Sequence, residues 1–258
     1  MDNIIDLDFD FYKFILKKEH VPCMLLVQSI SEFDRATLIN RITSLGCQFS
    51  LENSTIHLTA FLIDKFLSKK VVGINNLSLV GAACFSLACK YDANSPPKLF
   101  DIVYSMDRTR TQLDLSNMEA VVLNTIDFNL TSPTANTFLC NLVNQVPNDF
   151  SYEMFNISSY YIELFLLTAP TIQFPYSLVA ASSLVLARIL LDIDDLWPEN
   201  MKIVTDLSLG EMYDCMVFVS SLVSAANKYD PTKTVREKYS RRRFNSVAKL
   251  KQPDDLLR

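Results

Sequence analysis

Residues 78–88 read SLVGAACFSLA and residues 177–187 read SLVAASSLVLA, so one stretch of the chain occurs twice. The two copies align without a gap at an offset of 99 residues, and six of the eleven pairs are identical. Small residues in the middle of each copy let neighbouring helices approach a central helix closely. A proline break follows each copy, at Pro96 and at Pro198. We therefore predict two helical bundles with one plan; the alternative is chance similarity between two helices rich in Ala and Leu.

The rest of the chain extends this helical pattern. Apolar residues recur at spacings of three and four in segment after segment, and strand signals are weak. Ser31 and Ser208 each open a helix as part of a capping box, and Ser132 with the following proline marks a fresh helix start. We predict an all-α protein with two bundles of about five helices and an N-terminal helix. The predicted parts are a lead-in (1–30), a first bundle (31–131), a second bundle (132–230) and a basic C-terminal tail (231–258).

Composition excludes several classes of function. Only 4 glycines are present in 258 residues, so a glycine-rich phosphate-binding loop has nothing to be built from. The net charge of -5 opposes binding to nucleic acid. No cysteine or carboxylate lies at metal-ligand spacing from His20 or His57, and neither histidine belongs to a recognisable catalytic arrangement. We expect no metal, no cofactor and no enzymatic activity.

The cysteines and the apolar runs indicate a cellular compartment. The six cysteines form no Cys-x-x-Cys motif and mostly occupy apolar stretches, as free thiols do in a reducing compartment. The amino terminus is acidic where a signal peptide is basic. The longest apolar run, residues 178–191, is interrupted by polar residues and is shorter than the ~20 residues of a membrane span. We expect a soluble, intracellular protein without a membrane partner.

Several stretches, in their order along the chain, resemble the cyclin family of the mitotic A/B type over nearly the whole length. They are RATLI at 35–39, FLIDKFLS at 61–68, LVGAA at 79–83, LACKY at 87–91, two prolines at 96–97, MEAVVL at 118–123, FNLTSPT at 128–134 and VREKY at 235–239. The resemblance implies the tandem cyclin-box fold of two five-helix bundles. It also implies a regulatory subunit that binds and activates a cyclin-dependent kinase and helps to select its substrates in cell-cycle control.

The resemblance implies a kinase-binding surface as well. Lys90 and Glu119 match the charged pair that in the family meets the kinase helix whose glutamate must swing inward for activity. We expect both to be exposed helix-end charges, which contribute little to stability. The alternative for Lys90 is an ordinary helix-end lysine favoured by the helix dipole. The flanking candidates are Tyr91, Leu87, Leu123 and Phe128, together with Phe11 and Phe14 of the N-terminal helix, which could instead dock that helix on its own domain.

Two further sets of residues follow from the resemblance. Arg35 and Asp64 match an internal ion pair that is structural. Many relatives form an apolar groove that docks Arg-x-Leu motifs of substrates and inhibitors, and here Leu38 and Leu77 remain at its positions. Arg41, however, stands where the groove has an indole. Because a cation removes the apolar floor and repels the motif's arginine, we expect weak docking of Arg-x-Leu peptides.

A different class of function stays open beside the kinase regulator. The alternative is a cyclin-fold scaffold or transcription-factor-type interaction protein that activates no kinase. The net charge opposes DNA binding, and the pair Lys90 and Glu119 favours the kinase. The basic run of Lys238 and Arg241 to Arg243 is either a nuclear import or anion-binding patch or a solvated tail. We expect the protein in the nucleus and the cytoplasm.

Overall fold

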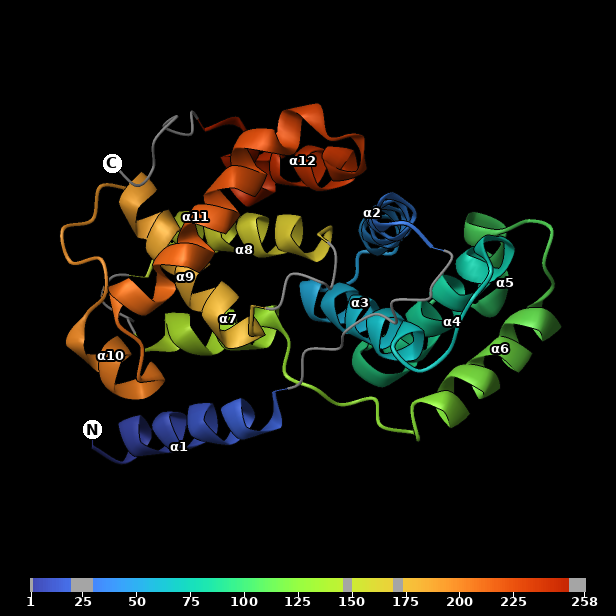
Figure 1. Ribbon diagram of the computed structural model, residues 1–258, viewed down its shortest axis with the longest axis horizontal. Coiled ribbons are helices and arrows are strands. Elements are labelled where there is room, and N and C mark those ends of the chain that lie inside the picture. Colours follow the sequence, from blue (N-terminus) through green and yellow to red (C-terminus); the bar gives the residue numbers. More distant parts are fainter. Residues whose placement is uncertain (1, 20–29, 146–149, 169–173, 251–258) are drawn as a thin grey trace. The chain divides into compact units, whose positions relative to one another are not determined.

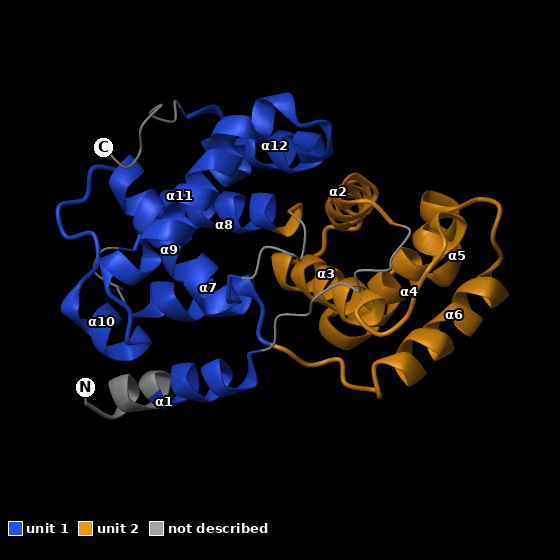
Figure 2. Cartoon of the chain, in the orientation of Figure 1, with its two compact units in different colours: residues 1–20, 133–165, 174–258 blue, residues 21–132, 166–173 orange. Residues whose placement is uncertain are grey.

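The computed structural model describes residues 2–19, 30–145, 150–168 and 174–250, and side chains from Asp10 onward. The chain forms two compact units (Figure 2). Unit 1 comprises Met1–His20, Pro133–Phe165 and Phe174–Arg258, and unit 2 comprises Val21–Ser132 and Leu166–Gln173.

Unit 2 is a bundle of five helices, one of which is buried at the centre. The helices are α2 (Glu32–Gln48), α3 (Asn53–Leu67), α4 (Ile74–Asp92), α5 (Leu99–Met106) and α6 (Gln112–Thr125) (Figure 1). The first copy of the repeat lies in α4, which packs against the other four. A Cβ atom added at Gly81 would lie 2.6 Å from Leu38 Cδ1, so the absence of a side chain lets α2 approach. The predicted central helix with small residues is confirmed.

Unit 1 repeats this plan with the second copy. Its helices are α1 (Asp2–Lys18), α7 (Ala135–Asn144), α8 (Tyr152–Leu166), α9 (Tyr176–Leu190), α10 (Glu199–Thr205) and α11 (Leu209–Ala225). Shorter helices follow: η1 (Ala226–Lys228), η2 (Asp230–Thr232), α12 (Lys233–Tyr239), η3 (Arg242–Phe244) and η4 (Val247–Lys249). The second copy lies in α9, which packs against α7 and α11. The described part of the chain is helical with connecting turns and holds the two predicted bundles, α2–α6 and α7–α11.

The helix starts depend on local hydrogen bonds. The capping boxes predicted at Ser31 and Ser208 are both present. The start of α7 differs by two residues from the expectation, because Thr134 rather than Ser132 caps the helix. Thr111 and Asp114 form another capping box, at the start of α6, which we did not predict.

The predicted N-terminal helix, α1, belongs to unit 1. Its residues Tyr12 and Ile15 are buried, and the Tyr12 ring lies 5.7 Å from the ring of Phe138 on α7. Glu19, just after α1, accepts hydrogen bonds of 2.8 Å from the backbone and from the hydroxyl of Ser177 on α9. Burial raises the pKa of Glu19, while the hydrogen bonds from Ser177 oppose that rise.

The predicted basic tail is also part of unit 1, at least as far as its first helix, α12. Lys238 is buried, and its Nζ lies 2.6 Å from Glu163 Oε1 on α8. The hydroxyl of the buried Tyr239 donates to the same carboxylate oxygen at 2.6 Å. This buried cluster fixes α12 on α8, so the tail prediction is wrong for this segment.

One helical stretch in the described residues is long and apolar enough to cross a membrane. It is Leu209–Lys228, with a mean hydropathy of 1.2, and not the run at 178–191 considered above. Its residues Met212, Cys215 and Val219 are buried, and α11 packs on α9. The stretch is 33% buried, so one face of it packs in the core while Tyr213 and Val217 on other faces are exposed.

The thiols show the expected state where they are described. Cys47, Cys84, Cys89, Cys140 and Cys215 are free, whereas Cys23 lies outside the described residues. Burial raises the pKa of the Cys89 thiol to about 12 and that of Cys215 to about 11. These two thiols therefore stay protonated at neutral pH and are poor nucleophiles.

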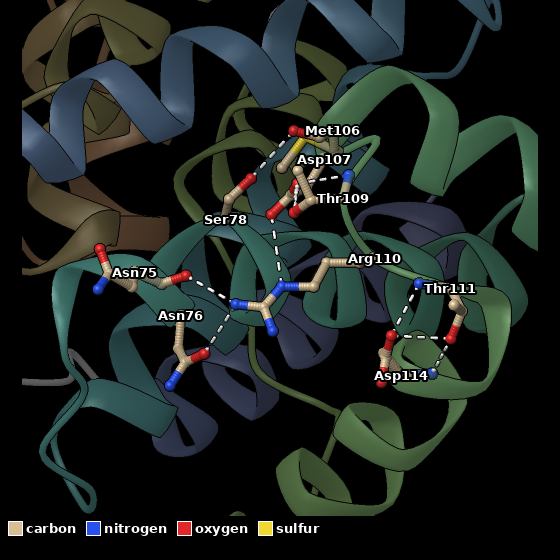
Figure 3. A network of polar contacts seen from close by, with 9 residues as sticks. All are labelled: Asn75, Asn76, Ser78, Met106, Asp107, Thr109, Arg110, Thr111 and Asp114. Atoms are coloured by element: carbon tan, nitrogen blue, oxygen red, sulfur yellow. Dashed lines mark hydrogen bonds and ion pairs between the residues drawn. The ribbon is translucent and has the colours of Figure 1, made fainter.

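A polar network fixes the loop between α5 and α6 (Figure 3). The Arg110 guanidinium donates to the Asn75 carbonyl at 3.0 Å and to Asn76 Oδ1 at 3.1 Å, and its Nε lies 3.5 Å from Asp107 Oδ2. Thr109 donates to Asp107 through both its backbone and its hydroxyl. The loop is thereby tied to the start of α4.

Acidification should loosen this loop only at low pH. The Thr109 hydroxyl, followed by the Thr109 backbone and Arg110, lowers the pKa of Asp107, and the backbone and hydroxyl of Thr111 lower that of Asp114. A carboxyl whose pKa falls on folding contributes stability above its unfolded value, here 3.8, and loses it as pH falls through the folded value. Carboxyl chemical shifts measured by NMR should place both midpoints below 3.8. Midpoints at or above that value would contradict the network.

Candidate functional site

The predicted charged pair forms a direct ion pair between two helices of unit 2. Lys90 Nζ near the end of α4 lies 2.7 Å from both carboxylate oxygens of Glu119 on α6. The Lys90 side chain is 47% exposed, whereas that of Glu119 is 9% exposed. Glu119 is therefore not the exposed charge that we expected. The carboxylate holds the ammonium group in place, while about half of the Lys90 side chain remains exposed.

Four apolar or aromatic residues were predicted to flank this pair, and two of them are exposed. Tyr91 is 55% and Phe128 66% exposed. Leu123 lies one turn after Glu119 on α6 and is half-buried, whereas Leu87 is buried in the core. Residues four apart on a helix share one face, so Glu119 and Leu123 lie on the same side of α6. Leu87 supports α4 from inside and does not contribute to an open surface.

The turn after α6 presents Phe128 to solvent. Asp127 and Phe128 both have positive φ, at 57° and 54°, and the Phe128 backbone donates to the Leu123 carbonyl at 2.9 Å. A left-handed conformation costs a residue such as Phe about 1–2 kcal/mol. Strain of this kind persists where surrounding contacts enforce it, and it is frequent at functional sites.

Two lysines, one in the last turn of α3 and one just after it, provide these contacts. Lys65 Nζ donates to the Asn129 carbonyl at 2.9 Å, and Lys69 Nζ lies 2.6 Å from Asp127 Oδ2. Burial lowers the pKa of Lys65, and the Lys69 charge lowers it further. The strained turn thus has a contact on each side of Phe128, whose ring is exposed.

The N-terminal helix shows a second exposed aromatic pair, which belongs to unit 1. Phe11 and Phe14 are exposed, while Tyr12 and Ile15 on the adjacent face are buried. The Lys18 ammonium lies 5.9 Å from the Phe14 ring centroid. Docking of α1 on its own unit therefore uses Tyr12 and Ile15 and leaves the two predicted phenylalanines available.

The predicted structural ion pair is present and buried. Arg35 on α2 donates from Nε and Nη2 to the two carboxylate oxygens of Asp64 on α3, both at 2.7 Å. Its Nη1 donates to the carbonyls of Leu166 and Thr168 at 2.8 and 2.7 Å, within the same unit. The guanidinium therefore joins three segments of unit 2.

The three residues predicted to line a docking groove do not come together on the surface. Leu38 and Leu77 are buried in the core, and only Arg41 is exposed. Arg41 Nη2 donates to the Ser105 carbonyl at 2.7 Å, so its side chain reaches the last turn of α5. Arg41 lines an open pocket with Ser44 and with residues of α5, and the pocket contains neither leucine.

Comparison with known proteins assigns the chain to a family. Residues 10–131 match the family model described as the cyclin N-terminal domain, and residues 133–253 match the cyclin C-terminal domain. The chain belongs to the cyclin family.

Curated relatives are A-type and B-type cyclins at about 30% identity. Cyclin-B2-1 of Arabidopsis thaliana is 34% identical over 243 residues, covering 93% of this chain and 56% of the relative. Cyclin-B2-2 of the same plant is 32% identical over 244 residues, with the same shares. The chain thus spans little more than half of these relatives. The G2/mitotic-specific cyclin S13-7 of Glycine max is 31% identical, covering 94% of this chain and 93% of the relative.

Solved structures share the fold. A viral cyclin from herpesvirus saimiri superposes with a TM-score of 0.72 at 22% identity, covering 84% of this chain and 96% of that one. A chain of the yeast RNA polymerase II CTD kinase complex CTDK-1 superposes with a TM-score of 0.59 at 11% identity, covering 90% of this chain and 94% of that one. At these identities the likeness shows the fold alone.

Proposed function

We propose that this chain is the regulatory subunit of a cyclin-dependent protein kinase of the cell cycle, with no catalysis of its own. The observation that carries the proposal is the exposed face of Lys90, held at 2.7 Å by the buried carboxylate of Glu119. By resemblance to the family, both residues match the charged pair with which cyclins meet the kinase helix. A charge fixed before binding loses little conformational freedom when the partner docks.

The exposed aromatic residues supply the apolar part of the same contact. Interfaces concentrate their binding energy in a few aromatic and charged residues. Tyr91 follows Lys90 directly, and Phe128 is held in water by an anchored, strained turn. By placing the kinase helix, these contacts favour the internal lysine–glutamate pair on which kinase activity depends.

Complex formation with purified kinases tests the proposal. We expect the chain to co-elute with a cyclin-dependent kinase in size-exclusion chromatography, and we expect no shift of duplex DNA at physiological salt. The acidic net charge of -5 supports the second expectation. Specific DNA binding, with no complex with any kinase of a cyclin-dependent panel, would favour the transcription-factor alternative and contradict the proposal.

We extend the proposal to the cell compartment, with residence in both nucleus and cytoplasm. Arg241, Arg242 and Arg243 are exposed, whereas Lys238 is buried with Glu163 and is removed from the basic run. Three exposed arginines in a row suit recognition by an import receptor. A fluorescent fusion in which all three are glutamine should lose its nuclear fraction, and an unchanged distribution would contradict this part.

A further inference from the structure

An open pocket of about 470 Å³ lies between α2 and the end of α5, within unit 2. Its lining residues are Arg41, Ser44, Leu45, Gln48, Tyr104, Ser105 and Arg108. The lining combines two cations, one aromatic ring and several hydrogen-bonding groups. We call it the α2–α5 pocket.

The two arginines of this pocket lack an anionic partner within the described residues. One N–H group of Arg41 donates to the Ser105 carbonyl. The Arg108 guanidinium lies over the Tyr104 ring, 4.2 Å from its centroid, and its Nε donates weakly to the Tyr104 carbonyl at 3.4 Å. A guanidinium has five N–H donors, so most donors of both groups remain available. In a chain of net charge -5, two such cations in one pocket are not part of a generally basic surface.

The nearest acidic residue in sequence does not neutralise Arg108. The Asp107 carboxylate is occupied by Thr109 and Arg110, as Figure 3 shows. Ser78 donates to the Met106 carbonyl at 3.1 Å and holds the last turn of α5 to α4. The network therefore fixes the backbone on both sides of Arg108, and the charges of Asp107 and Arg110 are paired with each other.

An aromatic pair continues the pocket along α5. The Phe100 and Tyr104 rings are stacked, with centroids 6.0 Å apart and planes at 21°, and both are exposed. Phe100 and Tyr104 are four residues apart on α5 and lie on one side of the helix, and Arg108, in the turn after α5, lies over the Tyr104 ring. The two rings offer apolar surface directly beside the cationic pocket.

We propose that the α2–α5 pocket docks a short acidic segment of a partner protein. The carboxylate of a glutamate or aspartate accepts from Arg41 and Arg108, and a neighbouring apolar side chain packs on Tyr104 and Phe100. Arginine forks match carboxylates in a bidentate geometry, which gives such a contact orientation as well as attraction. The choice of occupant follows from charge complementarity: the pocket repels the arginine of an Arg-x-Leu motif and attracts the opposite charge. The inference does not depend on kinase activation, since it concerns a surface of the chain alone.

Fluorescence anisotropy with the purified full chain tests this docking. The probe is a fluorescein-labelled peptide with two adjacent glutamates followed by a leucine, in a glycine-serine flank. We expect saturable binding that weakens with added salt, because the contact is ionic. The same peptide with glutamines for glutamates should bind at least about tenfold more weakly. Equal binding of the two peptides, or no binding of the glutamate peptide, would overturn the proposal.

Variants of the chain place the binding at this pocket. Arg41→Gln and Arg108→Gln should each weaken binding of the glutamate peptide about tenfold. Arg242 is exposed and does not line the pocket, so Arg242→Gln should leave the affinity unchanged. Circular dichroism checks that each variant is folded. Unchanged affinity in both pocket variants would overturn the assignment. Tighter binding of an Arg-x-Leu peptide, or of a phosphoserine peptide when the glutamate peptide fails, would overturn the choice of an acidic segment.

Discussion

The double variant Lys90→Glu/Glu119→Lys should keep its fold but lose most of its affinity for the kinase. In the unmodified chain, 2.7 Å separates the charged groups of Lys90 and Glu119. The swap retains an ion pair between α4 and α6, but it places the negative charge at the exposed position. Reversing a charge at a desolvated contact costs ~2–5 kcal/mol of binding free energy, which is roughly 30-fold to several thousand-fold in affinity. Titration calorimetry with the kinase measures the loss.

A matched swap controls for the manipulation itself. Lys202 is 48% exposed, close to the 47% of Lys90, and pairs with Glu199 at 3.0 Å. The variant Lys202→Glu/Glu199→Lys should bind the kinase as the unmodified chain does. The single variant Lys90→Glu should also loosen the fold, because a second carboxylate then faces the buried carboxylate of Glu119. Full kinase affinity in the double swap at positions 90 and 119 would show that the pair is structural only.

Of the variants described, Asp64→Asn should cause the largest fall in the free energy of unfolding. It removes the carboxylate that accepts from Arg35 Nε and Nη2 and leaves that guanidinium buried. Breaking a buried ion pair by removing one partner costs ~3–5 kcal/mol, because the remaining charge stays desolvated. Urea denaturation followed by circular dichroism measures the fall in the free energy of unfolding. Lys202→Gln, at an exposed pair, should change it by only about 0.5 kcal/mol, and a similarly small change in Asp64→Asn would contradict the structural role.

The helical plan could be predicted because its signals are local. The capping boxes at Ser31 and Ser208 lie within four residues, and the repeated small-residue helices carry their packing requirement in their own composition. The ion pairs are different. Lys90 and Glu119 lie 29 residues apart, as do Arg35 and Asp64, and resemblance to a family suggested them where spacing alone did not.

The rest could not be predicted because distant partners decide it. Lys238 belongs to a basic run in the sequence, but it is buried and pairs with Glu163, 75 positions earlier. At Phe128 the left-handed conformation falls on an aromatic residue and not on the glycine, asparagine or aspartate that usually adopts it. The α2–α5 pocket depends on Arg41 and Arg108, which the sequence separates and the bundle brings to one cavity.

The rate of phosphotransfer by a purified cyclin-dependent kinase, measured as the chain is titrated in, tests the central claim most directly. We predict that the rate rises to a plateau with the unmodified chain and with the Lys202→Glu/Glu199→Lys control. The Lys90→Glu/Glu119→Lys chain should require far higher concentrations for the same rate. A kinase rate that does not respond to the unmodified chain, across a panel of cyclin-dependent kinases, would contradict the account.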